Sequence, residues 1–159
     1  MKEPGVKLAP AGITARELID GYCGGMAAGH TFKAYLPGGA SGGILPASMD
    51  DIPLDFGGPL AKVGAFVGSH AVVVLSDEDS VKEATINLLK FFKHESCGQC
   101  TPCRSGTEKM VSLLQRDGPL DEQAIRDLED VMRDASICGL GQAAPNPVNH
   151  LLTYFRDDL

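Results

Sequence analysis

The feature that most constrains this chain is a run of three cysteines, Cys97, Cys100 and Cys103, in a C-x-x-C-x-x-C pattern. Thiolates at this spacing on one tight turn can bind three corners of an iron–sulfur cube, and the fourth iron then needs a ligand from elsewhere. Cys138 follows after 34 intervening residues, within the glycine-containing segment Ile137–Gly141. We therefore predict a 4Fe–4S cluster on these four cysteines, which requires Cys138 to fold back beside the run.

Other uses of the cysteines remain open. Four thiolates also suit tetrahedral zinc, although structural zinc is usually held by two separated cysteine pairs. Disulfides are rare in the reducing compartments where clustered thiols act as metal ligands. Cys23 stands apart from the others, and we interpret it as a buried, inert thiol. His94 is close to Cys97 in the sequence, but a surface position at a helix end is a better interpretation than metal ligation.

Glycine and proline divide the chain into two parts. Fourteen of the 19 glycines and six of the ten prolines precede residue 71, and helical periodicity dominates after about Ser80. We predict an α+β domain over residues 1–79 and a helical, cluster-binding domain over residues 80–159.

The first part carries signals for a few short elements. Thr14 and Glu17 form a capping-box pattern, which predicts a helix over Arg16–Tyr22. Short strands are expected at Val6–Leu8, Phe32–Leu36 and Ala71–Leu75. The last of these is an unbroken apolar run, which is typical of a buried strand. Residues 37–59 are rich in glycine and proline, and they form either a functional loop or a stretch that hides a further element.

The second part shows four amphipathic helical patterns. The helices are expected at residues 80–93, 101–115, 125–135 and 145–155. Thr101 is expected to cap the second helix, with Pro102 in its first turn. In the third helix, Ile125, Leu128 and Val131 belong to an apolar stripe that should face the core. Because short helices bury such stripes against one another or against a partner, we predict a small four-helix bundle.

Charge and motifs argue against several functions. The net charge is −7 without a basic stripe, which is a poor match for nucleic acid. No apolar run reaches membrane-spanning length and the Met1 end lacks a signal-peptide pattern, so a cytoplasmic location without membrane contact is expected. No nucleophile elbow, P-loop or zinc-protease motif is present. Gly38–Gly43 lacks dinucleotide-binding spacing and predicts a turn instead of a phosphate cradle.

Two cysteine-containing segments, Glu95–Thr107 and Ile137–Val148, resemble a known family. They are similar to the cluster motif and the fourth-ligand segment of the NADH-binding flavoprotein subunit of complex I. Relatives in this family include the beta subunits of NAD-dependent formate dehydrogenases and the diaphorase subunits of NAD-reducing hydrogenases. The segments Tyr35–Ser41 and Val67–His70 resemble the family's ubiquitin-like, SLBB-type β-grasp domain. Within the family, Lys7–Gly12 and Gly42–Pro46 look most like the formate dehydrogenase beta subunits.

The resemblance implies a β-grasp domain followed by a four-helix bundle that binds the 4Fe–4S cluster. The family's flavin- and NADH-binding domain, with its glycine-rich fingerprint, has no counterpart in this chain. The chain is therefore interpreted as the C-terminal portion of such a subunit, FMN and NAD are not assigned to its residues, and it is not expected to be catalytic alone.

The implied function is electron transfer in a complex of the formate dehydrogenase or NADH dehydrogenase type. The cluster would relay electrons between an FMN/NAD(H) site outside this chain and other iron–sulfur centres. Implied partners are the flavin domain, a thioredoxin-like 2Fe–2S subunit and a larger iron–sulfur catalytic subunit. The alternative is a ligand- or partner-binding module in which a zinc ion has only a structural role.

Overall fold

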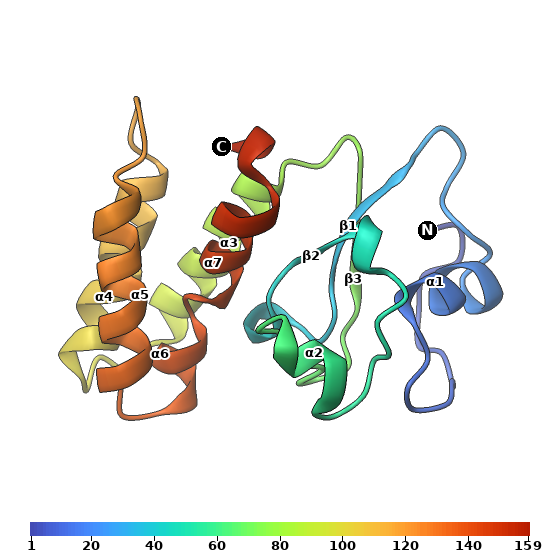
Figure 1. Ribbon diagram of the computed structural model, residues 1–159, viewed down its shortest axis with the longest axis horizontal. Coiled ribbons are helices and arrows are strands. Elements are labelled where there is room, and N and C mark those ends of the chain that lie inside the picture. Colours follow the sequence, from blue (N-terminus) through green and yellow to red (C-terminus); the bar gives the residue numbers. More distant parts are fainter. The chain divides into compact units, whose positions relative to one another are not determined.

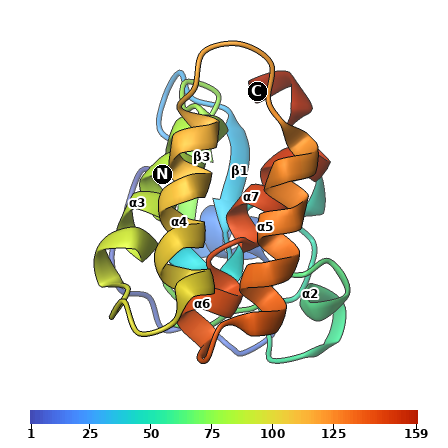
Figure 2. The same ribbon diagram turned by 90° about the vertical axis from the view of Figure 1, so that its left-hand side faces the viewer.

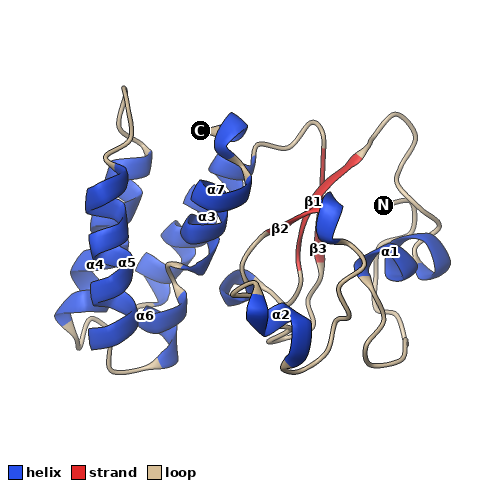
Figure 3. Cartoon of the chain, viewed as in Figure 1, coloured by secondary structure: helices blue, strands red, loops and turns tan.

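The computed structural model describes residues 1–159, and the chain has an α+β architecture (Figures 1 and 3). It divides into two compact units, Met1–Ser80 and Val81–Leu159. The division falls one residue from the boundary expected from composition. All three strands belong to the first unit, as the red segments of Figure 3 show, so the regular elements of the second unit are all helices.

A three-stranded antiparallel sheet organises the first unit. The strands β1 (Phe32–Leu36), β2 (Leu45–Pro46) and β3 (Val73–Ser76) lie in the order β2-β1-β3, with β1 in the centre. The strand expected at residues 32–36 is confirmed, and its Ala34 and Tyr35 are fully buried. The Tyr35 hydroxyl donates a hydrogen bond to the Met49 carbonyl oxygen at 2.8 Å. The two-residue strand β2 is the element hidden in the Gly- and Pro-rich stretch.

Two strand predictions were wrong in part. Val6–Leu8 is not a strand, and its Val6 and Leu8 side chains are exposed because no neighbouring strand covers them. The buried strand expected at Ala71–Leu75 is instead β3, which begins two residues later. Since β3 is an edge strand, its apolar residues are only partly covered, and Val73 remains 45% exposed.

The capping box at the start of the first helix is confirmed. The Glu17 amide donates to the Thr14 hydroxyl at 3.2 Å, and the Glu17 carboxylate accepts from the Thr14 amide at 3.0 Å. The helix α1 (Ala15–Glu17) then widens into a π-helical turn at Leu18–Tyr22. A further short helix, α2 (Gly58–Lys62), was not predicted.

Close backbone contact explains one glycine of the Gly38–Gly43 turn. A Cβ atom on Gly38 would lie 1.8 Å from the carbonyl oxygen of Val67, so no side chain fits there. The turn therefore packs against the segment before β3. In the same segment His70 has a φ of +57°, which is unusual for a residue with a side chain.

The second unit consists of helices. They are α3 (Val81–Glu95), α4 (Thr101–Leu114), α5 (Glu122–Ala135), α6 (Gly139–Ala143) and α7 (Asn146–Tyr154). Four of them correspond to the predicted helices, whereas the short α6 was not predicted. Figure 2 shows α4 and α5 side by side, joined by a loop at one end, with α6 at the other end.

The core of the second unit is apolar and tightly packed. Its fully buried side chains include Leu89, Met110, Leu114, Ile125, Met132, Leu151 and Leu152. Burying one such side chain contributes about 1.5–3 kcal/mol. The helices α4 and α5 approach closely because Gly106 has no side chain: a Cβ atom there would lie 2.4 Å from the Met132 sulfur.

The predicted apolar stripe of α5 was wrong in one respect. The buried residues of this helix are Ile125, Glu129 and Met132, whereas Val131 is 51% exposed. The close contact between Gly106 and Met132 fixes how α5 is turned about its axis, and this rotation places a carboxyl group inward. Apolar residues alone could not indicate that rotation.

Candidate metal centre

The cysteine run lies in the loop after α3 and in the first turn of α4. Cys97 is exposed in the loop, Cys100 is half-buried, and Cys103 is buried. Cys100, not Thr101, is the N-cap residue of α4, with the extended backbone that an N-cap requires. The three thiols therefore lie before α4 or within its first turn, where free amide groups and the helix dipole favour negative charge.

Hydrogen bonds hold this loop in shape. The Ser96 hydroxyl lies 3.3 Å from the Cys103 sulfur and accepts from the Gly98 amide at 3.3 Å. The Arg104 guanidinium donates to the Gly98 carbonyl oxygen and to the Thr101 hydroxyl, the latter at 3.3 Å. Arg104 thus braces the loop and places a positive charge beside the cysteines. The role of Ser96 was missed, although its place directly before a cysteine was visible in the sequence.

Cys138 comes to the same end of the second unit through α6. It is exposed and is the N-cap residue of that helix. A Cβ atom on Gly141 would lie 2.8 Å from the Cys103 Cβ atom and 2.4 Å from the Ser136 hydroxyl oxygen. Because Gly141 lacks a side chain, α6 lies directly against the first turn of α4. The segment that carries Cys138 therefore packs on the segment that carries Cys103.

The surroundings of Cys100 favour a thiolate. Its pKa lies below the ordinary value because backbone N–H groups face the sulfur, first that of Ile137 and then that of Cys103. The Ser136 hydroxyl, which is buried without a well-formed hydrogen bond, lowers the Cys100 pKa by a smaller amount. Ile137 and Ser136 directly precede Cys138, so donors from one cysteine segment act on a thiol of the other. Metal ligands of this kind must be deprotonated, and the site suits an anionic, sulfur-rich cofactor.

The remaining candidate ligands lie elsewhere. Cys23 is buried in the first unit, and all five cysteines are free thiols. His94 is exposed and its ring nitrogen lies 2.9 Å from the Glu95 carboxylate. No three histidine, cysteine or acidic side chains are grouped closely enough to share one metal ion. In an iron–sulfur cube each iron takes its own thiolate, so the four ligands surround the cluster instead of meeting at one point.

Comparison with known proteins agrees with this chemistry. Residues 83–159 match the family described as the NADH-ubiquinone oxidoreductase-F iron-sulfur binding region. The predicted 4Fe–4S cluster is thereby confirmed as the cofactor of the region, whereas the assignment of individual cysteines to it remains a prediction.

Relatives extend the similarity to nearly the whole chain. The F subunit of NADH-quinone oxidoreductase from Mycobacterium bovis is 39% identical over 160 residues, covering 98% of this chain but 36% of that protein. Its counterpart from Rickettsia typhi is 39% identical over 154 residues, again covering 36% of its own length. The chain thus spans about a third of the curated relatives that it matches.

Solved structures show the same fold. A chain of an NAD⁺-reducing [NiFe]-hydrogenase in the H₂-reduced state is similar with a TM-score of 0.82 and 31% identity. The match covers 98% of this chain and 27% of the hydrogenase chain. The air-oxidized state of such a hydrogenase matches with a TM-score of 0.71. A special closeness to formate dehydrogenase beta subunits, expected from two short segments, has no support among these relatives.

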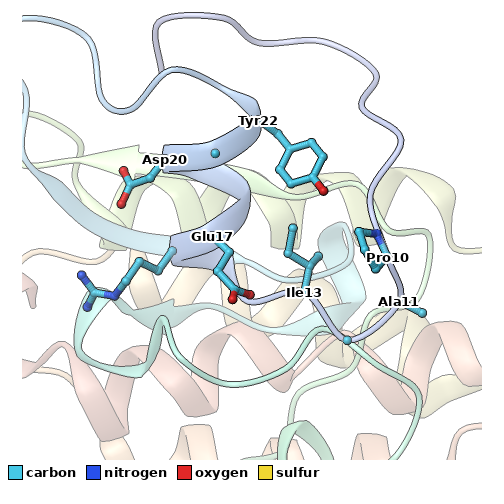
Figure 4. Close-up of a pocket in the computed structure, with 9 residues that line it drawn as sticks. Pro10, Ala11, Ile13, Glu17, Asp20 and Tyr22 are labelled. Carbon is cyan, nitrogen blue, oxygen red and sulfur yellow. The ribbon is translucent and has the colours of Figure 1, made fainter.

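The first unit contains a cavity of different chemistry. It has a volume of about 670 Å³ and is lined by residues 10–13, 16–17 and 20–22. Figure 4 shows Tyr22, Ile13 and Pro10 on one side and the carboxylates of Glu17 and Asp20 on the other. No cysteine or histidine lines it.

No helix of the chain is both long and apolar enough to span a membrane.

Proposed function

We propose that this chain is an electron-transfer module whose 4Fe–4S cluster is bound by Cys97, Cys100, Cys103 and Cys138. The contact between the two cysteine segments carries this proposal. Gly141 packs α6 against the first turn of α4, and the Ile137 amide faces the Cys100 sulfur. Both features bring the isolated fourth cysteine toward the run.

The chain's own residues would hold the cluster and adjust its potential. A bound 4Fe–4S cluster supplies reversible one-electron storage, and hydrogen bonds to its sulfurs and its burial affect the potential. The N–H groups of Ile137 and Cys103 and the N-terminus of α4 all favour negative charge at the site. Ser96 and Arg104 keep the ligand loop in shape.

The module would work inside a larger oxidoreductase. It would relay electrons between an FMN/NAD(H) site outside this chain and other iron–sulfur centres, with a thioredoxin-like 2Fe–2S subunit and a larger iron–sulfur subunit as partners. The relatives from NADH-quinone oxidoreductase and the NAD⁺-reducing hydrogenase chain support a redox complex of this kind. We include a cytoplasmic location in the proposal, because free, clustered thiols are typical of reducing compartments.

Metal and sulfide analysis of the anaerobically purified chain tests the cofactor. We expect about four irons and four sulfides per chain, with an absorption band that bleaches when a reductant is added. One zinc without sulfide would instead support a structural metal in a binding module. NADH-dependent dye reduction by the pure chain would contradict its role as a module that is not catalytic alone.

A further inference from the structure

A buried carboxyl group in the second unit has no part in the proposed cysteine site. Glu129 lies on α5 and is only 6% exposed. Its Oε1 atom is buried without a hydrogen-bond partner. A buried carboxyl oxygen without a partner is costly, and a cost of this kind often marks a functional group. Glu129 also lines a cavity of about 310 Å³.

Three helices and the α6–α7 junction provide the walls of this cavity. Its lining residues are Arg126, Glu129, Asp130, Arg133, Gln142, Pro145, Asn146 and Asn149. The charged groups near Glu129 are Arg126, Asp130 and Arg133, all on α5 itself. The residues from α6, α7 and their junction are uncharged, and the buried His150 of α7 does not line the cavity. The nearest charges to Glu129 therefore come from its own helix.

Burial and the neighbouring charges together place the pKa of Glu129 near neutral pH. Burial raises its pKa to about 7, and the neighbouring Asp130 raises it as well, while Arg126 and Arg133 oppose this shift. Arg133 is itself paired with Asp130 at 2.6 Å and with Asp134 at 3.2 Å. A modest change in the local electrostatic potential would thus change the protonation of Glu129.

The cavity and the fourth cysteine share one short helix. Gln142 of α6 lines the cavity, and its side-chain amide donates to the Ser136 carbonyl oxygen at 3.1 Å. Ser136 lies two residues before Cys138, which is the N-cap residue of the same helix. Gln142 therefore connects the wall of the cavity to the segment that carries Cys138.

We propose that Glu129 is a redox-linked proton site, whose carboxylate binds one proton from solvent when one electron is added to the cluster. The inference rests on the proposed function, because it requires the cluster at Cys138. The electron comes from a one-electron donor such as a reduced flavin, and the proton ends on the Glu129 carboxyl group. Negative charge added to the cluster favours the protonated acid, and by reciprocity the protonated acid favours the reduced cluster.

Redox titrations of the reconstituted chain, followed by paramagnetic resonance between about pH 6 and 8, test the proposal. In the unsubstituted chain the midpoint potential should fall as pH rises, because the ionised Glu129 disfavours reduction. One proton per electron would give at most about 59 mV per pH unit for a one-electron couple. Glu129→Gln should lower that slope at least twofold. Asp127→Asn, which removes an exposed carboxylate from the same helix, should keep it.

Infrared difference spectra provide a measurement that needs no variant. Reduction should produce the C=O band of a protonated carboxyl group, and labelling glutamate with ¹³C should shift it. A potential independent of pH, or the absence of this band in a chain that holds four irons, overturns the proton site alone. A chain without any iron–sulfur cluster overturns the proposed function instead.

Discussion

The two units use glycine in the same way and obtain different results. In the first unit, Gly38 allows a loop to pack on the Val67 carbonyl group. In the second, Gly141 allows α6 to pack on Cys103. The first contact joins two loop segments that contain no candidate ligand, whereas the second joins two segments that carry cysteines. A glycine contact of this kind can therefore bring proposed ligands together only where the segments that it joins carry them.

Each unit also buries one carboxyl group, and the two carboxyl groups differ in their hydrogen bonding. Asp50 of the first unit is 5% exposed and accepts a hydrogen bond from the Arg16 guanidinium at 2.7 Å. Glu129 of the second unit is 6% exposed, and one of its oxygens has no partner. A paired buried carboxylate is structural, whereas an unpaired one is free to respond to charge nearby.

The largest expected effect separates two buried cysteines, one in each unit. Cys103→Ser should abolish the normal four-iron signal, because a serine oxygen is a poor replacement for a thiolate on iron. Cys23→Ser should leave the iron content unchanged, although Cys23 is as buried as Cys103. Iron per chain and low-temperature paramagnetic resonance would measure both.

The same measurements compare the effects of serine substitutions at the other three proposed ligands. Cys138→Ser should leave a three-iron or labile cluster, since the cysteine run can still hold three corners. Cys97→Ser and Cys100→Ser should lose the normal signal, as Cys103→Ser does. A normal four-iron signal in Cys138→Ser, together with its loss in Cys23→Ser, would show that the ligand assignment is wrong.

Alanine at the two close-packed glycines should separate folding from cofactor binding. Gly38→Ala should destabilise the first unit by more than about 3 kcal/mol, because its Cβ atom would meet a backbone oxygen, while iron binding survives. Gly141→Ala should lower the iron content, because the new methyl group pushes α6 away from Cys103.

Gly139→Ala is the matched control for these substitutions. Gly139 lies in the same helix as Gly141, and a Cβ atom there would have no neighbour within 4 Å. It should retain both stability and iron, since alanine has the higher helix propensity. Chemical unfolding together with iron analysis gives both readouts, and equal iron loss in Gly139→Ala and Gly141→Ala would refute the packing argument.

The two buried acids should respond to amidation with opposite signs. Asp50→Asn should destabilise the cluster-free chain by about 1–2 kcal/mol, because it weakens the bond from Arg16. Glu129→Gln should stabilise that chain at about pH 8 by about 1–3 kcal/mol, because it removes a buried, ionised group.

The pH dependence of the unfolding free energy tests how Glu129 affects stability. The pKa of Glu129 is about 7 in the folded chain, against an ordinary value of 4.5, so the folded state binds the proton more tightly between these values. Its contribution to stability therefore falls as pH rises through this window and is lowest above it. Urea unfolding across the window measures this slope, and an unchanged slope in Glu129→Gln would contradict the assignment.

The smallest expected effect concerns His70 in the first unit. Its φ of +57° costs about 1 kcal/mol for a residue with a side chain. His70→Gly relieves this strain but gains unfolded-state entropy and loses the edge contact with Phe56, whose ring centroid is 5.2 Å away. The net change in unfolding free energy should stay within about 1 kcal/mol, and iron binding should not change. A larger loss would mean that this turn matters more than its strain suggests.

Local signals in the sequence determined most of the helices and half of the candidate site. The capping box at Thr14, the apolar stripe of α4 and the cysteine run each depend on residues close together in the chain. Such patterns fix local geometry wherever the chain folds. The cysteine spacing predicted the 4Fe–4S cluster, which the family match confirms.

The remaining features depend on contacts between residues that lie far apart in the sequence and meet only in the folded chain. The short β2 exists because β1 lies beside it, and the packing of α6 on α4 depends on Gly141 and Cys103, far apart in the sequence. The burial of Glu129 in place of Val131 follows from the rotation of α5 against Gly106. Hydrophobic periodicity describes one helix at a time, whereas the rotation of a helix depends on the shape of its neighbour.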